Sequence, residues 1–147
     1  MTVRRIATCL ALVIIPGVGM VAAQATATAP QAVMSAFKQA YPNATILHVS
    51  RERRDGKVVY ELETRDGTMR RDLIYDLEGH TLEIEEILPA DSVPAAVRAG
   101  LERDLKGATI LGAERVMRAD TVLYEVQARK AGRTQILTYD PEGTRKE

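Results

Sequence analysis

The sequence of 147 residues has few of the side chains on which many reactive sites depend: one cysteine, two histidines, one phenylalanine and no tryptophan. The single cysteine, Cys9, lies in an apolar N-terminal run that we expect to be removed on export. The mature chain then has no disulfide, no cysteine-based metal site and no thiol nucleophile. Its stability must therefore come from a core of tyrosine and aliphatic side chains.

The sequence also has no excess of positive or negative charge, because its 20 lysines and arginines balance its 20 aspartates and glutamates. Loss of Arg4 and Arg5 with an export signal would leave a formal charge of −2. Nucleic-acid-binding proteins carry a clear basic excess or a basic stripe, so nucleic acid is not an expected partner. The mature length, 147 minus 25 residues, suits one compact domain.

Residues 1–25 have the pattern of a signal peptide. Two arginines precede an uncharged, mostly apolar run, and Ala23-Gln24-Ala25 supplies the small-x-small pattern that signal peptidase reads. The run is shorter than the stretch of about 20 apolar residues that a membrane span needs. We therefore predict a periplasmic or secreted protein with no stable membrane span after cleavage, which follows Ala23 or Ala25. An uncleaved N-terminal anchor is the alternative.

The remainder of the chain is an internal duplication with a constant offset of 64 residues. Residues 30–83 placed over residues 94–147 give 19 identities in 54 positions without a gap. Agreement at this level is several-fold above chance, so we predict two repeats. The predicted boundaries are residues 1–25 for the signal peptide, 26–88 for the first repeat and 89–147 for the second.

Each repeat is predicted to begin with one helix. Pro30 and Pro94 suit the first helical position, where the missing N–H has no partner to lose. Asp91 or Ser92 can cap the second helix. Apolar residues then recur at helical spacing on one face of each segment. Gly107 is expected to end the second helix as a left-handed C-terminal cap.

After each helix the apolar period changes to 2, as in half-buried strands. Tyr60 and Leu62 alternate with Glu61 and Glu63, and pairs such as Asp-Gly separate the strands as hairpin turns do. A unit of this size is marginal alone, so two units should share one sheet. The predicted fold class is α+β, with two tandem repeats that each contain one helix followed by a three- or four-stranded antiparallel meander. The helices are expected on one face of the sheet.

Three short motifs carry a family resemblance: YPNATI at residues 41–46, YEL at residues 60–62 and YDLEG at residues 75–79. In this order they resemble the PepSY-like family, whose tandem members share the fold of the beta-lactamase inhibitor proteins. The resemblance covers about residues 30–147 and implies an exported bacterial protein. Protease inhibition or regulation has been suggested for such units, and the family has no accepted catalytic residues. The resemblance thus implies a non-enzymatic binding module whose partner is an unknown exported protein or peptide.

One sheet face is the candidate partner-binding surface. Glu61 and Glu125 are repeated and point away from the tyrosines that alternate with them. Apolar residues ringed by charge on the same face are what a recognition surface needs. The candidate residues are Val59, Glu61, Glu63, Arg70, Asp72, Ile74, Leu123 and Glu125. A merely solvated sheet face is the plain alternative, and the alternative function is an envelope sensor that binds a small ligand or a cation at the repeated acidic positions.

Other chemistry has little support in the spacing of residues. His48 and His80 form no HxxxH or HExxH pattern, so no metal site is expected. Residues 76–79 and 140–143 supply only two acidic residues each and suit a hairpin turn better than a calcium loop. No serine lies in a hydrolase motif. We therefore predict no catalytic residues and no cofactor.

Two further groups of residues are expected to have structural roles. The repeated tyrosines stand in register with apolar residues and should lie in the core. They are Tyr60, Tyr75, Tyr124 and Tyr139. Basic residues around the Asp55-Gly56 turn should keep a hairpin tip soluble, with an anionic partner as the alternative. They are Arg51, Arg53, Arg54 and Lys57.

Overall fold

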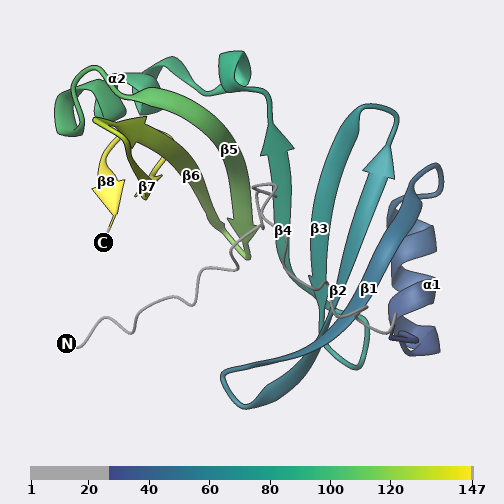
Figure 1. Ribbon diagram of the computed structural model, residues 1–147. Coiled ribbons are helices and arrows are strands. Elements are labelled where there is room, and N and C mark those ends of the chain that lie inside the picture. Colours follow the sequence, from purple (N-terminus) through teal and green to yellow (C-terminus); the bar gives the residue numbers. More distant parts are fainter. Residues whose placement is uncertain (1–26, 147) are drawn as a thin grey trace, which may run out of the picture.

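The computed structural model describes residues 27–146, so the predicted signal peptide lies outside the described residues. Within this range the chain forms two α-helices, one short 3-10 helix and eight strands (Figure 1). The helices are α1 (Gln31–Ala40), η1 (Ala90–Ser92) and α2 (Ala95–Asp104). The strands are β1 (Thr45–Arg54), β2 (Lys57–Asp66), β3 (Met69–Tyr75), β4 (Thr81–Leu88), β5 (Thr109–Arg118), β6 (Thr121–Lys130), β7 (Arg133–Tyr139) and β8 (Arg145–Lys146).

All eight strands belong to one antiparallel sheet, and each strand pairs with the strand that follows it in sequence. The strand β1 and the two-residue strand β8 are therefore the edges of the sheet. This arrangement confirms the predicted α+β class and the antiparallel sheet. In the part of the chain that the structure describes, no helix has the length and apolar character needed to cross a membrane.

Each α-helix packs on its own part of the sheet and forms its own hydrophobic core. The first core contains Ala29, Val33, Phe37, Val49, Tyr60, Leu62, Leu73 and Tyr75. The second contains Val93, Val97, Leu101, Ala113, Val126, Ala128, Leu137 and Tyr139, with Tyr124 packed against it. Ile84 packs against the first core and Leu88 against the second. Because these two residues are four positions apart on β4, both cores lie on the same side of that strand. The expected core position is confirmed for Tyr60, Tyr75 and Tyr139, whereas Tyr124 is half-buried against the second core.

The junction between the two cores is polar. Glu86 of β4 is 4% exposed and stands in register between Arg71 of β3 and Arg115 of β5. Its Oε1 atom lies 3.3 Å from Nε of Arg71, and its Oε2 atom pairs with Nη2 of Arg115. The Arg71 guanidinium also lies over the ring of Tyr41, 5.6 Å from its centroid. This buried carboxylate thus has a cation on each side, which offsets the cost of removing it from water.

The repeated glycines Gly79 and Gly143 let the turns after β3 and β7 approach the helices. Their φ angles are +87° and +78°, in the left-handed region. A Cβ atom on Gly79 would lie 2.7 Å from the carbonyl oxygen of Ala32 in α1, and one on Gly143 would overlap the carbonyl group of Ala96 in α2. Glycine alone satisfies both the backbone angle and the close approach. The glycine of the YDLEG motif therefore has a structural role.

The helix termini differ from the sequence-based expectation. Pro30 and Pro94 are N-cap residues with extended ψ angles of 153° and 144°, so each helix begins one residue after its proline. Asp91 and Ser92 belong to η1, and α2 has no side-chain cap. Gly107 has a left-handed φ of +73° but lies beyond the C-cap residue of α2. The predictions of a side-chain cap for α2 and of a first helical position for the prolines are therefore wrong.

Candidate functional site

The face of the sheet that points away from both cores, termed the open face, collects charged side chains from six strands. Side chains alternate between the two faces of a strand, so core residues such as Leu62 and Leu73 identify the neighbours that point the other way. The open face comprises Ser50, Glu52, Arg54, Val59, Glu61, Glu63, Arg70, Asp72, Ile74, Glu83, Glu85, Ile87, Glu114, Val116, Arg118, Leu123 and Glu125. All eight residues predicted as a partner-binding surface lie on it.

The apolar residues of the open face are less accessible than expected. Val59 and Ile74 are only 2% and 1% exposed, whereas Leu123 is half-buried. The expectation that Val59 and Ile74 contribute to an exposed apolar patch is therefore wrong. For Ile74 the physical reason is that the longer side chain of Arg54 extends over it to Glu61 and Glu83.

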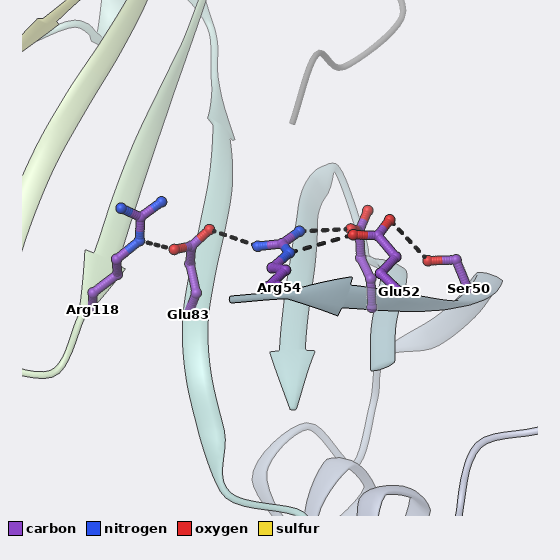
Figure 2. Close-up of polar contacts among 6 residues, drawn as sticks. Ser50, Glu52, Arg54, Glu83 and Arg118 are labelled. Atoms are coloured by element: carbon purple, nitrogen blue, oxygen red, sulfur yellow. Dashed lines mark hydrogen bonds and ion pairs between the residues drawn. The ribbon is translucent and has the colours of Figure 1, made fainter. Parts of the chain in front are cut away.

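Two arginines join several of these carboxylates into a chain of ion pairs (Figure 2). In Arg54, Nη2 lies 3.0 Å from Oε2 of Glu61 and Nη1 lies 3.2 Å from Oε1 of Glu83. The Nε atom of Arg54 lies 3.3 Å from Oε2 of Glu52. Arg118 pairs with the second carboxylate oxygen of Glu83. The chain of ion pairs reaches from β1 to β5 across the sheet.

This chain explains why Ile74 is buried on a face that no helix covers. The strand register places Ile74 of β3 directly between Glu61 of β2 and Glu83 of β4. The Arg54 guanidinium contacts both flanking carboxylates, so it must pass over Ile74. A long basic side chain can shield apolar surface with its stem while its charged head stays hydrogen-bonded. Charged side chains therefore cover the middle of the open face.

A neighbouring row of the open face carries three adjacent carboxylates. The register pairs Glu63 of β2 with Asp72 of β3, and Asp72 with Glu85 of β4. Side chains in such positions have Cβ atoms about 5 Å apart, and like charges there are destabilising. Within residues 27–146, none of the ion pairs includes any of these three residues. Glu63, Asp72 and Glu85 are termed the carboxylate row.

The surroundings of three carboxyl groups of the open face, Glu61, Asp72 and Glu85, favour their protonated form. Burial, with a smaller contribution from the neighbouring Glu114 carboxylate, raises the pKa of Glu85 to about 8. Burial, followed by the charge of Glu63, raises the pKa of Asp72 to about 6. Burial is also the largest cause of the raised pKa of Glu61, about 7. Part of the open face therefore carries protons at neutral pH.

The second half of the chain adds a like-charged pair and an apolar strip. Glu114 of β5 stands opposite Glu125 of β6, and burial raises the pKa of both carboxyl groups. Glu85 pairs in register with Val116 of β5, which pairs with Leu123 of β6. A single line across the sheet therefore passes from the carboxylate row to apolar side chains.

Arg54, Glu83, Glu85, Glu114 and Arg118 belong to this face but are absent from the predicted site residues. The expectation that Arg54 keeps a hairpin tip soluble is wrong, because its guanidinium turns back across the face to Glu61 and Glu83. Alternation along β1 and β5 is a signal in the sequence that places both arginines on this face. Their reach across neighbouring strands depends on side-chain geometry, which the alternation does not contain.

Asp76, His80 and Asp140 have partners within their own turns. His80 Nδ1 lies 2.9 Å from Asp76 Oδ2, and Asp76 Oδ1 accepts the backbone N–H groups of Glu78 and His80. The equivalent Asp140 accepts the backbone N–H of Thr144. These repeated aspartates therefore close turns, as expected. Among residues 27–146, no group of three or more His, Cys, Asp or Glu side chains could hold a metal ion.

Two helices packed on an eight-stranded antiparallel sheet, with an open polar face opposite them, define a two-layer α+β protein. The sequence matches the family described as "Putative beta-lactamase-inhibitor-like, PepSY-like" over residues 22–83 and over residues 65–145. The chain belongs to this family, so the resemblance seen in its motifs is confirmed. No curated protein is significantly similar to the chain in sequence.

Solved structures from Bacteroides share the fold. A BLIP-like protein from Bacteroides fragilis is 18% identical with a TM-score of 0.68, and the alignment covers 84% of this chain and 86% of that one. A structure from Bacteroides eggerthii described as "putative periplasmic proteins" is 16% identical with a TM-score of 0.69, covering 81% and 86%. A DUF2874 family protein from Bacteroides ovatus is 17% identical with a TM-score of 0.69, covering 82% and 86%. At these identities the likeness concerns the fold.

Proposed function

We propose that the protein is an exported, non-enzymatic binding module that holds a protein or peptide partner on its open face. Membership of the beta-lactamase-inhibitor-like, PepSY-like family supports a binding role. The signal-peptide pattern of residues 1–25 and the periplasmic description of the Bacteroides eggerthii protein support export. In the most concrete form of the proposal, the partner is an exported peptidase that the module inhibits or regulates.

The carboxylate row is the observation that carries this proposal. A face that is only solvated leaves its charges in water, whereas Glu85 is 9% exposed and stands opposite another carboxylate. Such an arrangement costs stability. A partner that supplies complementary charge offsets that cost in the complex and gains specificity from it.

We further infer that the binding surface is built by duplicated units, residues 26–88 and 89–147. The sequence identity at an offset of 64 residues and the boundary between β4 and η1 support this division. Each unit contains one helix followed by strands of the shared sheet. One unit alone would bury too little apolar surface to be stable, so the sheet continues across both.

The proposal is tested by chemical crosslinking of the exported protein in envelope extract, with variants that reverse charge on the open face. The best positions are Glu63 and Glu125, because neither takes part in the ion pairs of Arg54. The test variant is Glu63→Arg/Glu125→Arg. The matched control is Glu78→Arg/Glu142→Arg, which makes the same change in charge at exposed turn residues.

We expect a discrete crosslinked partner with the wild-type protein and with the control variant, and its loss with the open-face variant. Circular dichroism and thermal unfolding establish that each variant is folded. Equal capture by all three proteins would show that the open face is not the binding surface. Inhibition of a captured peptidase by wild-type protein then tests the regulatory form of the proposal.

A second candidate function is an envelope sensor that binds a small ligand or a cation at the repeated acidic positions, Glu61 and Glu125, whose pKa values burial raises. A ligand that binds only the native state raises the unfolding temperature by mass action. Calcium or zinc should then stabilise the wild-type protein more than the Glu63→Arg/Glu125→Arg variant. An equal rise of the unfolding temperature in the wild-type protein and in this variant would exclude the sensor function.

A further inference from the structure

The open face has more carboxylates than cations to pair with them. Glu83 is shared by Arg54 and Arg118, and Arg54 also contacts Glu61. The ion pairs of these arginines lie in the row of the sheet that contains Ile74. The adjacent carboxylate row therefore remains without an ion pair among residues 27–146.

Glu85 is the buried member of the carboxylate row. It is nine-tenths buried, it stands on the central strand β4, and it forms no hydrogen bond or ion pair among the described residues. The adjacent Glu86 is also buried but is paired with two arginines on the other face. The carboxylate oxygens of Glu85 are not among the fully enclosed atoms that lack a partner, so they reach the surface of the open face, where a cation of a ligand can contact them.

The positions next to Glu85 indicate the shape of that cation. In one direction across the strands the row continues to Asp72 and Glu63, and in the other to Val116 and Leu123. Adjacent strands are about 4.8 Å apart, so a long side chain with its head at Glu85 extends over Val116, and the neighbouring part of a ligand reaches Leu123 on the next strand. Lysine and arginine have this character, with an apolar stem and a charged head.

We propose that the occupant of the open face is a protein segment that places an arginine or lysine head on Asp72 and Glu85, with the stem of that side chain over Val116 and the rest of the segment at Leu123. This inference rests on the proposed function and adds the chemistry of the partner. A basic side chain offers several N–H donors and can contact two carboxylates of neighbouring strands at once. It also suits a surface on which the described carboxylates do not converge on a metal ion.

Binding of such a side chain should release protons. The groups that face Glu85 are Asp72 on β3, Glu114 on β5, Glu61 on β2 and Arg54 on β1. Three of these four groups are acidic, and with burial they hold the pKa of Glu85 near 8. A basic head beside Glu85 favours its ionised form, so complex formation removes a proton. Affinity is therefore expected to increase as the pH rises from about 5 to about 8.

The test is selection of peptides from a random display library on the exported protein, followed by affinity measurement on matched peptide pairs. In each pair, the basic residue of a selected peptide is replaced by citrulline, which keeps the shape of arginine without its charge. The protein variant is Asp72→Asn/Glu85→Gln, and the control is Glu78→Gln/Glu142→Gln. Calorimetry in two buffers of different ionisation enthalpy reports the protons released.

We expect selected peptides to share a basic residue, citrulline to weaken binding about tenfold or more, and the row variant to do the same. The control variant should bind as the wild type does, and proton release should be absent in the row variant. Selected peptides without a basic residue, equal binding of citrulline peptides, or displacement by calcium would overturn the inference and leave the proposed function standing. Failure to enrich any peptide relative to the Glu63→Arg/Glu125→Arg variant would overturn both.

Discussion

Replacement of Glu85 by glutamine should stabilise the protein at alkaline pH. The glutamine side chain has nearly the same shape but never ionises. In the folded wild type, burial and the Glu114 carboxylate raise the pKa of Glu85 from 4.5 to about 8. Between these two values the folded state holds a proton that the unfolded state has lost. The unfolding free energy of the wild type therefore falls as the pH rises through this window.

The size of the effect follows from the pKa values. A pKa difference of one corresponds to about 1.4 kcal/mol, so a rise from 4.5 to about 8 sets an upper limit of about 5 kcal/mol. Relaxation of the face and entry of water reduce this value. We expect Glu85→Gln to raise the unfolding free energy by about 1 to 3 kcal/mol at about pH 8 and by much less at about pH 4.

Urea unfolding followed by circular dichroism at several pH values measures this difference. The control is Glu86→Gln, next along the chain, because Glu86 pairs with Arg71 and Arg115. That change leaves two half-buried arginines without their buried carboxylate partner and should lower the unfolding free energy by about 2 kcal/mol. A Glu85→Gln variant that is less stable than the wild type at about pH 8 would refute the reasoning, since it would mean that an ionised Glu85 stabilises the fold.

Three further changes should separate structural from binding roles. Gly79→Ala should lower the unfolding free energy by about 3 kcal/mol, because it combines a left-handed φ with a Cβ 2.7 Å from Ala32 O, whereas Gly56→Ala, with a similar φ and open space around it, should cost about 1 kcal/mol. If thermal unfolding shows that both variants lose the same stability, the close approach to α1 is not the reason that position 79 requires glycine. Arg54→Met should destabilise the protein by about 1 to 2 kcal/mol, and more at about pH 8 than at about pH 5, because Glu61, with a pKa of about 7, loses its cationic partner in the ionised form. A loss that does not change with pH would contradict the ion-pair account of Arg54. Glu63→Gln should change stability by less than about 0.5 kcal/mol near pH 5 and weaken partner binding without unfolding the chain; a variant that binds the partner as the wild type does would place Glu63 outside the contact.

Much of the architecture can be predicted from the sequence because local and long-range signals agree. Alternation of Tyr60 and Leu62 with Glu61 and Glu63 identifies β2 and assigns its two faces. Glycines at hairpin positions fix the strand boundaries, and the duplication links the two halves. The helix starts were misplaced by one residue because Pro30 has an extended ψ that excludes it from the helix.

The open face could be predicted as a set of residues but not as an arrangement. Alternation places Glu63, Asp72 and Glu85 on one side, but their alignment in a single row depends on the register of three strands. The position of Arg54 over Ile74 depends on rotamers of a long side chain, which no periodic pattern specifies. For this reason the sequence pattern predicts Val59 and Ile74 at the surface, whereas the structure buries both.

The central claim is that the open face contacts the partner, and site-specific photocrosslinking tests it most directly. A benzoylphenylalanine residue is placed at Leu123, which is half-buried on the open face, or at Leu77, which is 46% exposed in the turn after β3. Irradiation in envelope extract should link Leu123→benzoylphenylalanine protein to a discrete partner and leave the Leu77 variant unlinked. Crosslinks from position 77 with none from position 123 would contradict the account.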